Sequence, residues 1–368
     1  MEVHRCRFVP YPPSAINALA FSHSSTPTLR SKGPPTLRLA IGRANGDIEI
    51  WNPLRGAWYQ ESIFRGGKDR SIEGLVWTQD PEDVDKNGYK TPGRLRLFSI
   101  GYSTAVTEWD LAAGRPARHS SGNYGEIWCM AAQPKDHCLK TPTNEAHGKD
   151  RAEETDLQTQ CVAVGCADGA IVLLNTAEDD LRFSRILARP AKKRSRVLSI
   201  TFQNRCTIIA GHADSTIRVY DLRNKQSMRN MTLGAGPKDG PKETLVWSVK
   251  CLSDGTIVSG DSTGTLSFWD GKTYALLQRI NGHEADILDV AVSADGQTVF
   301  SGSLDRRTSM YKKMGSGNLG EKLRWAKMAH QRFHKHDVKA MATFETKSMS
   351  VVASGGTQRL MTFSLARR

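Results

Sequence analysis

The feature that most constrains this chain is a short pattern that recurs seven times along its 368 residues. Each copy has an alternating apolar segment, a turn rich in Gly, Asp, Ser or Thr, and a second such segment with a bulky side chain at its end. The copies read LAIGRANGDIEIWN, LFSIGYSTAVTEWD, VAVGCADGAIVLLN, IIAGHADSTIRVYD, IVSGDSTGTLSFWD, VFSGSLDRRTSMYK and VASGGTQRLMTFS. The aligned end residues are Trp51, Trp109, Leu174, Tyr220, Trp269, Tyr311 and Phe363. Repeats of this kind are typical of arrays whose neighbouring units share a core.

Each copy is expected to supply part of one small four-stranded sheet. An apolar segment such as INALAFS or VLSITF precedes every copy, and a more polar one follows it. Short runs that alternate with a period of two predict strands rather than helices. Because one such sheet cannot bury both faces, we expect an all-β, seven-bladed β-propeller. The predicted blades of this single domain, 1–368, cover about residues 14–65, 71–120, 126–190, 196–235, 243–280, 286–331 and 337–365.

The two ends of the sequence predict how the ring closes. The seventh copy stops near Ser364 and Leu365 without an outer strand, while residues 3–9 form an apolar segment with no blade of their own. Pairing the two would remove two exposed sheet edges. Polar insertions at 80–93 and 135–159 are predicted between the first and second strands of their blades, and therefore on one rim.

The copies resemble the repeats of WD-repeat proteins, in which a His, a Ser or Thr, an Asp and an aromatic residue form a buried hydrogen-bonded group. Only the sixth copy has the complete set, which is His283, Ser301, Asp305 and Tyr311. Because this group holds turns in place, the four residues are predicted to be structural and not a hydrolase triad. No phosphate-binding loop, zinc-protease motif or nucleophile elbow occurs. We therefore expect no enzyme, and no cofactor.

Two other motif matches fail on their context. GSGNLG at 315–320 fits a dinucleotide-binding pattern, but it falls between two strands of one blade rather than between a strand and a helix. DVDKNGYKTPGR at 83–94 begins like a calcium loop, yet Arg94 stands where a bidentate Glu is needed. Seven scattered cysteines without a C-x-x-C pair indicate neither a zinc site nor a disulfide framework, and favour an intracellular setting. We predict no metal site and, without a signal or spanning segment, no membrane partner.

Basic charge points to a polyanionic partner. Lys and Arg number 51 against 38 Asp and Glu, a net charge of +13, which favours nucleic acid among other polyanions. Several cations fall in the segments that link one blade to the next, and such links emerge on one rim around the central channel. They could track a phosphate backbone, so we predict RNA binding by Arg65, Lys68, Arg70, Lys192, Lys193, Arg194, Arg196, Lys238, Lys242, Arg332 and Lys335. A solvated loop is the alternative for each link.

Few aromatic residues accompany these cations. Tyr124 and Phe333 are the chief ones, so we expect base stacking to contribute little and sequence selectivity to be weak. The exposed run KKRSR is also compatible with a nuclear import signal.

Several segments resemble one family in more detail than the repeat alone. VHRCRFVPYPPSAINALAFS, IWCMAAQP, SRVLSITF, VWSVKCLSDGTIVSGDSTGTLSFWD, HDVKAMA and SGGTQ are similar to the N-terminal part of the cirhin family, from residue 3 to about 365. The resemblance implies a non-catalytic scaffold of the nucleolar small-subunit processome. Its implied partners are the 5′ external transcribed spacer of pre-ribosomal RNA and other WD-repeat proteins, with roles in 18S RNA maturation and ribosomal-gene transcription. The family has tandem propellers, whereas this sequence has repeats for one.

A second class of function stays open at this stage. The chain could be a purely protein-binding propeller, such as a ubiquitin-ligase adaptor or a chromatin reader. Basic charge concentrated on one rim would favour RNA, whereas an acidic or apolar pocket at the channel mouth would favour protein. Neither class involves a small-molecule substrate.

Overall fold

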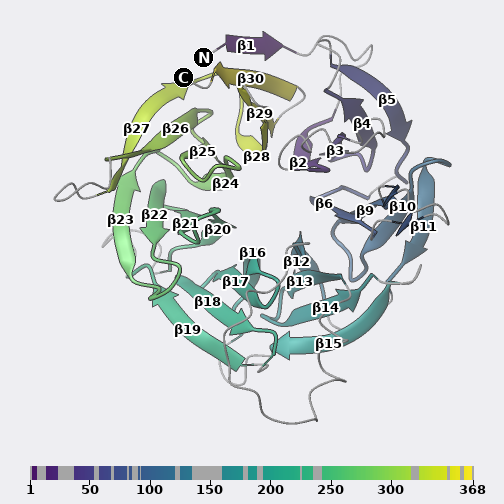
Figure 1. Ribbon diagram of the computed structural model, residues 1–368, viewed down its shortest axis with the longest axis horizontal. Helices are drawn as coiled ribbons and strands as arrows, with labels where there is room; N and C mark the ends of the chain where they lie inside the picture. Colours follow the sequence, from purple (N-terminus) through teal and green to yellow (C-terminus); the bar gives the residue numbers. More distant parts are fainter. Residues whose placement is uncertain are drawn as a thin grey trace.

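The computed structural model describes most of the chain as strands arranged in a ring. The described residues are 2–5, 14–23, 37–53, 58–67, 70–80, 83–84, 90–91, 93–120, 125–134, 160–176, 181–188, 194–223, 226–234, 243–315, 323–345, 349–356 and 360–366. They form seven four-stranded antiparallel sheets around a common centre (Figure 1) and, separately, one two-stranded sheet. None of these residues lies in a helix, so no helix here could cross a membrane. The predicted all-β propeller fold is confirmed.

Each four-stranded sheet is one blade, and its first strand is the innermost (Figure 1). The first blade contains β2 (Ile16–Phe21), β3 (Leu39–Arg43), β4 (Ile48–Asn52) and β5 (Tyr59–Phe64). The second contains β6 (Gly74–Gln79), β9 (Leu95–Ile100), β10 (Thr107–Asp110) and β11 (Arg115–His119). The third contains β12 (Ile127–Ala132), β13 (Cys161–Cys166), β14 (Ile171–Asn175) and β15 (Arg182–Ala188). The fourth contains β16 (Val197–Asn204), β17 (Thr207–His212), β18 (Thr216–Asp221) and β19 (Gln226–Thr232).

The remaining blades follow the same order. The fifth contains β20 (Val246–Cys251), β21 (Ile257–Asp261), β22 (Thr265–Trp269) and β23 (Leu276–Asn281). The sixth contains β24 (Ile287–Val292), β25 (Thr298–Ser303), β26 (Thr308–Met314) and β27 (Arg324–Gln331). The seventh combines β28 (Val338–Glu345), β29 (Met349–Gly356) and β30 (Leu360–Ala366) with a strand from the other end of the chain.

That outer strand closes the ring as the sequence predicted. β1 (Glu2–Arg5) pairs antiparallel with β30, with Glu2 opposite Ser364 and Arg5 opposite Met361. Figure 1 shows β1 on the outside of β30, close to both chain ends. The strand begins one residue earlier than expected and is described only to Arg5, because residues 6–13 lie outside the described part of the chain.

The insertion at 80–93 contains a small hairpin that the sequence did not predict. β7 (Asp83–Val84) pairs with β8 (Lys90–Thr91), and together they form the two-stranded sheet. Residues 135–159, the other predicted insertion, lie outside the described residues. Within the described ranges, no group of three or more His, Cys, Asp and Glu side chains could hold a metal ion.

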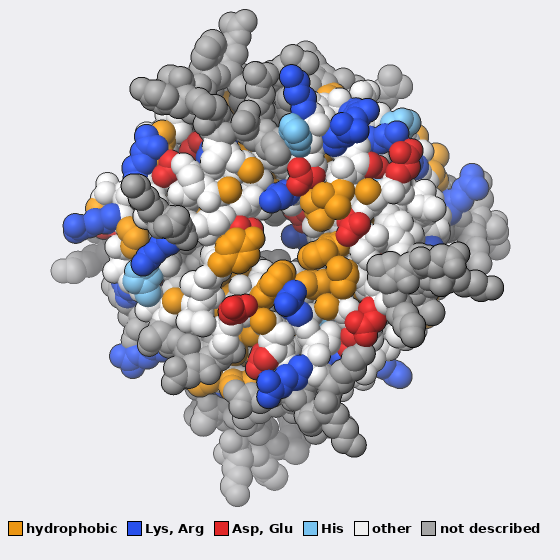
Figure 2. All heavy atoms as spheres, turned by 180° about the vertical axis from the view of Figure 1, so that it is seen from behind, with side chains coloured by type: hydrophobic (Ala, Val, Ile, Leu, Met, Phe, Trp, Pro, Cys, Tyr) orange, Lys and Arg blue, Asp and Glu red, His pale blue; other side chains and the backbone are white. Residues whose placement is uncertain are grey.

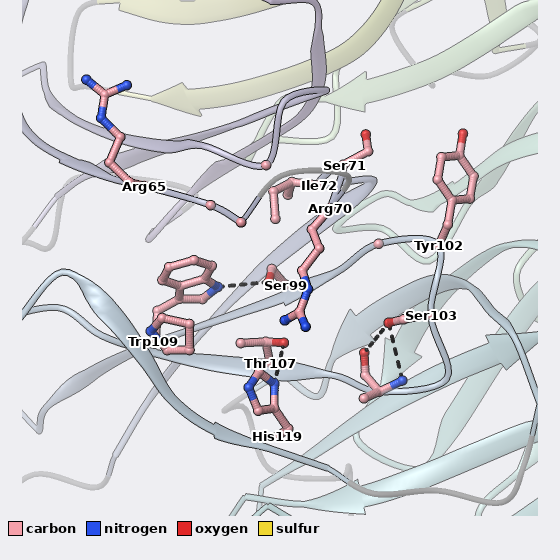
Figure 3. Close-up of a pocket in the computed structure, with 16 residues that line it drawn as sticks. Arg65, Arg70, Ser71, Ile72, Ser99, Tyr102, Ser103, Thr107, Trp109 and His119 are labelled. Carbon is pink, nitrogen blue, oxygen red and sulfur yellow. Dashed lines mark hydrogen bonds between the residues drawn. The ribbon is translucent and has the colours of Figure 1, made fainter.

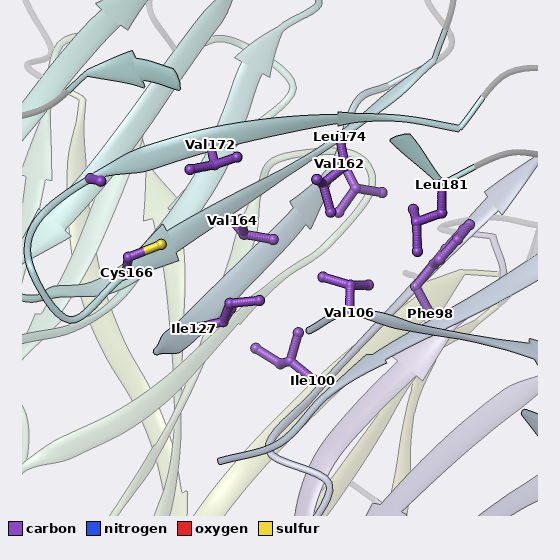
Figure 4. Close-up of a cluster of buried hydrophobic side chains, with 11 residues drawn as sticks. Phe98, Ile100, Val106, Ile127, Val162, Val164, Cys166, Val172, Leu174 and Leu181 are labelled. Carbon is purple, nitrogen blue, oxygen red and sulfur yellow. The ribbon is translucent and has the colours of Figure 1, made fainter. Parts of the chain in front are cut away.

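The hydrophobic core is divided among the gaps between neighbouring blades. Each of the seven buried clusters takes its side chains from two adjacent blades. Figure 4 shows the cluster between the second and third blades, where Phe98 and Ile100 pack against Val162, Val164 and Val172. A blade is therefore stabilised through its neighbours, and the closing β1–β30 pair affects the whole ring.

Close backbone contacts set the spacing between blades. A Cβ added to Gly302, on β25, would lie 2.6 Å from Cγ1 of Val338, the first residue of the next inner strand. The same contact, at 2.4–2.6 Å, joins Gly42 to Ile72, Gly165 to Val197, Gly211 to Val246, Gly260 to Ile287 and Gly355 to Ile16. In each pair a β-branched side chain fills the space that the glycine leaves open. The second blade departs from this rule, because buried Ile100 stands at the glycine position.

We expect Gly302→Ala to lower the free energy of unfolding by roughly 1–3 kcal/mol, because Val338 must move to admit the methyl group. Gly67→Ala is the control, since its nearest neighbour would be the flexible Arg70 side chain at 3.7 Å. Urea denaturation of both variants measures the effect. Equal midpoints for Gly302→Ala and the parent chain would contradict the proposed spacing role.

Deleting residues 1–10 should promote aggregation and lower the melting temperature, because the edge of β30 that pairs with β1 becomes exposed. Light scattering and thermal unfolding measure the two effects. A deletion variant as soluble and as heat-resistant as the parent would show that the closing strand contributes nothing to the ring.

Candidate functional site

The mouth of the central channel is lined by the beginnings of the inner strands. Every inner strand starts directly after a link between blades, so the first residues of all of them lie on the same rim. In six blades a β-bulge follows the first residue, and the bulged residues are Asn17, Trp128, Leu198, Trp247, Leu288 and Lys339. Glu73, which follows Ile72, has the corresponding place in the second blade. A bulge re-aims a side chain, and here it takes one residue per blade out of the regular ladder.

Half of this ring is polar and hydrogen-bonded. Lys339 Nζ donates to Asn17 Oδ1 at 3.3 Å, and Asn17 Nδ2 donates to Glu73 Oε1 at 3.0 Å. The Ser71 hydroxyl donates to the same Glu73 oxygen at 2.5 Å. The Glu73 carboxylate also raises the pKa of Tyr102 above its ordinary value, with burial and a hydrogen bond to Glu73 as further causes. The seventh, first and second blades are thereby joined.

The other half of the ring is apolar and spans the third to sixth blades. It consists of Trp128, Leu198, Trp247 and Leu288, which we call the apolar arc. The Arg196 guanidinium lies 4.0 Å from the centroid of the Trp128 ring, a cation–π contact. Trp247 Nε1 donates to Asp286 Oδ2 at 2.8 Å. Figure 2 shows hydrophobic side chains around the central opening on one face of the propeller, with basic and acidic side chains among them.

The sequence prediction did not include these tryptophans. Trp128 and Trp247 each stand second in an inner strand, in IWCM and VWSV, where strict alternation gives no reason to single them out. The signal that could have identified Trp128 and Trp247 in the sequence is that both are the second residue of an inner strand. The expectation that few aromatic residues accompany the basic links therefore needs correction.

The described residues predicted to bind RNA are all exposed and all belong to links on this rim. Arg65 and Arg70 lie between β5 and β6, and Arg194 and Arg196 between β15 and β16. Arg332 and Lys335 lie between β27 and β28. The other five predicted residues, Lys68, Lys192, Lys193, Lys238 and Lys242, lie outside the described residues. RNA binding by these side chains stays a prediction.

A pocket of about 480 Å³ opens between the first and second blades at the same rim. Arg65, Gly66, Gly67, Arg70 and Ser71 contribute from the link, and β9 to β11 contribute from the second blade (Figure 3). Arg65 Nη1 donates to Asp47 Oδ2 at 2.9 Å, although the Arg65 side chain remains 75% exposed. None of the described residues that line the pocket is acidic.

Other polar side chains that line the pocket are paired with one another. Trp109 Nε1 donates to the Ser99 hydroxyl at 2.8 Å, and Thr107 Oγ1 lies 2.9 Å from His119 Nδ1. Both pairs are drawn in Figure 3, where Arg70 points toward Thr107 and His119. The Trp109–Ser99 pair is structural. Arg70, in contrast to these paired side chains, makes no ion pair with any described residue.

The four residues of the sixth repeat form one buried network. His283 Nδ1 donates to Asp305 Oδ2 at 2.9 Å, and Nε2 accepts from the Ser301 hydroxyl at 2.7 Å. The Ser301 and Tyr311 hydroxyls are 3.5 Å apart. Asp305 also accepts from the backbone N–H of Arg307 at 2.9 Å. With its hydrogen bonds directed into the blade, the set fixes the turn after β25.

Related pairs occur in three other blades. His334 Nε2 lies 2.8 Å from the Ser354 hydroxyl in the seventh blade, in the arrangement of His283 and Ser301. The sequence prediction did not name this pair, although His334 precedes its inner strand by the same four positions as His283. In the second and fifth blades a tryptophan donates to the serine instead, from Trp109 to Ser99 and from Trp269 to Ser259.

Buried imidazoles make the stability of the ring depend on pH. Burial lowers the pKa of His212 and of His334 to about 4. It also lowers the pKa of His283, although the Asp305 carboxylate opposes that shift. An unfolded chain takes up these protons near pH 6.5. Between about pH 6.5 and 4 the unfolded state therefore binds more protons, and the free energy of unfolding falls as pH falls.

Acidification from pH 7 to pH 5 should lower the free energy of unfolding by about 2 kcal/mol for each of His212 and His334. Urea denaturation at several pH values measures this slope. His334→Gln should make the slope shallower by about one proton, whereas His336→Gln, which changes an exposed residue, is the matched control. A slope unaltered by His334→Gln would contradict the assignment of that imidazole as neutral in the folded state.

The fold and its repeated hydrogen-bonded groups define a WD40 β-propeller. Residues 274–312, which include the sixth-blade network, match the family described as "WD40: WD domain, G-beta repeat". The chain is 40% identical over 98% of its length to "U3 small nucleolar RNA-associated protein 4" of Schizosaccharomyces pombe, and covers 45% of that protein. It is 36% identical to the protein of the same name in Saccharomyces cerevisiae, over 98% of the chain and 42% of the relative.

A more distant human relative, "U3 small nucleolar RNA-associated protein 4 homolog", is 28% identical over 98% of the chain and 45% of its own length. The chain thus spans less than half the length of these curated relatives. Among solved structures, the computationally designed Ika8 protein aligns with a TM-score of 0.57 at 20% identity. That alignment covers 96% of this chain and 97% of the designed one, and it supports the fold alone.

Proposed function

We propose that this chain is the N-terminal propeller of a U3 small nucleolar RNA-associated protein 4, the cirhin family, and acts as a non-catalytic scaffold in ribosome biogenesis. The observation that carries the proposal is the 40% identity over 98% of the chain to the fission-yeast protein of that name. On this proposal the chain works in the nucleolus, within the small-subunit processome. It supports maturation of 18S RNA and transcription of ribosomal genes.

RNA binding is assigned to the rim that carries the basic links. The described cations there are exposed, and the net charge of +13 draws a phosphate backbone toward the molecule. The partner on this proposal is the 5′ external transcribed spacer of pre-ribosomal RNA. Phosphate contacts of this kind position an RNA without reading its sequence.

Binding of other WD-repeat proteins of the processome is assigned to the mouth of the channel. The apolar arc supports this part of the proposal, because bulky side chains gathered at one opening are typical of protein contact sites. The same observation favours the second candidate, a purely protein-binding propeller such as a ubiquitin-ligase adaptor or chromatin reader. RNA affinity of the isolated chain separates the two.

A chimaera tests the assignment to ribosome biogenesis. This chain replaces the matching part of the Schizosaccharomyces pombe relative in cells from which that relative can be depleted. We expect the chimaera to restore 18S RNA and to co-sediment with U3 RNA. The designed Ika8 protein in the same place is the control for fold alone. Loss of both readouts from a chimaera that is stably produced would refute the proposal.

The double variant Arg194→Ala/Arg196→Ala should remove up to about two units from the slope of log affinity against log salt, because each lost phosphate contact releases fewer counterions. Lys272→Ala/Lys312→Ala, which changes two exposed cations near the opposite rim, is the control of equal charge and should leave the slope unchanged. Fluorescence anisotropy with labelled spacer RNA gives both slopes. Equal slopes for the two double variants would mean that the link between β15 and β16 does not contact RNA.

A further inference from the structure

We infer that the pocket between the first and second blades receives one unpaired nucleotide of a bound RNA, with Arg70 contacting its phosphate. The inference rests on the proposed RNA-binding function and adds a specific site to it. It differs from the general phosphate track, because a pocket holds a base as well as a charge.

The pocket has the size of a small-ligand site. Its volume of about 480 Å³ falls in the range of roughly 300–1,000 Å³ that such sites occupy. A lone phosphate would leave most of that space unfilled. The two walls come from different blades that are held together by Gly42 and Ile72, so the cavity is part of the rigid ring.

The charge of the lining selects an anion. Two guanidinium groups border the cavity, and no described lining residue is acidic. Asp47 holds Arg65 through a 2.9 Å ion pair, whereas Arg70 is exposed and makes no ion pair with a described residue. A guanidinium can give a phosphate two parallel hydrogen bonds. Arg70 is therefore the side chain placed to bind one.

The rest of the lining suits a nucleobase. Tyr102 is 80% exposed, and Figure 3 shows it standing at the edge of the pocket. Its exposed ring offers a face on which a base can stack. Hydroxyl groups of Ser71, Ser103 and Thr107 and the His119 imidazole also line the cavity. They can exchange hydrogen bonds with a base edge or a ribose.

Single-stranded spacer RNA and the full chain provide the test, with Arg70→Gln and Tyr102→Ala as variants. Arg70→Gln should reduce the salt slope by about one unit, because one phosphate contact is lost. Tyr102→Ala should weaken binding roughly 5- to 150-fold at an unchanged slope, because stacking is lost without loss of charge. Tyr102→Phe should retain most of the affinity. Lys272→Gln is the control and should alter neither quantity.

Three outcomes count against the inference. If the parent chain binds RNA with a steep salt dependence while Arg70→Gln and Tyr102→Ala behave like the parent, the pocket is not a nucleotide site and the proposed function stands. If the parent chain does not bind RNA at all, the RNA part of the proposed function fails first. If a phosphoserine peptide binds in an Arg70-dependent way and RNA does not, the pocket belongs to a protein partner.

Discussion

The contact between a glycine of one blade and a β-branched side chain of the next is the constraint on which the rest of the ring depends. Gly302 and Val338 show why. The missing Cβ allows Val338 to enter the sheet of the sixth blade, and this insertion brings β28 against β25. Six interfaces use the same device. A larger residue at any of them would push two blades apart.

This constraint also explains the bulges at the channel mouth. Where the neighbouring blade supplies a glycine, the residue at the start of the inner strand points into that blade, as Val246 does toward Gly211. Resuming the regular pairing one residue later leaves an extra residue in between, and that residue is Trp247 in the fifth blade. The ring of bulged side chains at the channel mouth is thus a by-product of interblade packing. The chemical type of the bulged residue varies freely from blade to blade, whereas the type of the residue before it does not.

The sequence predicted the parts of the structure that local pattern controls. Period-two alternation identified the strands, and the unpaired segment at residues 3–9 predicted the closure later seen between β1 and β30. The role of Trp128 could not be predicted, because the alternation that predicts a strand does not reveal a bulge within that strand. The pocket could not be predicted either, since Arg70 and His119 line one cavity only when the two blades are packed side by side. Arg65 and Arg70 were named for their charge alone.

Local electrostatics explain why Arg70 stays available to a partner although carboxylates lie close to the pocket. Glu73 accepts hydrogen bonds from Asn17 and Ser71. Asp47 accepts from Arg65 and from the backbone N–H of Gly66 at 3.1 Å. Both acids are therefore committed to charge-assisted hydrogen bonds within the rim, which are stronger than neutral ones. Because these acids are already satisfied, the positive potential of Arg70 is directed at the cavity, and an anion that binds Arg70 displaces no ion pair between Arg70 and a described residue.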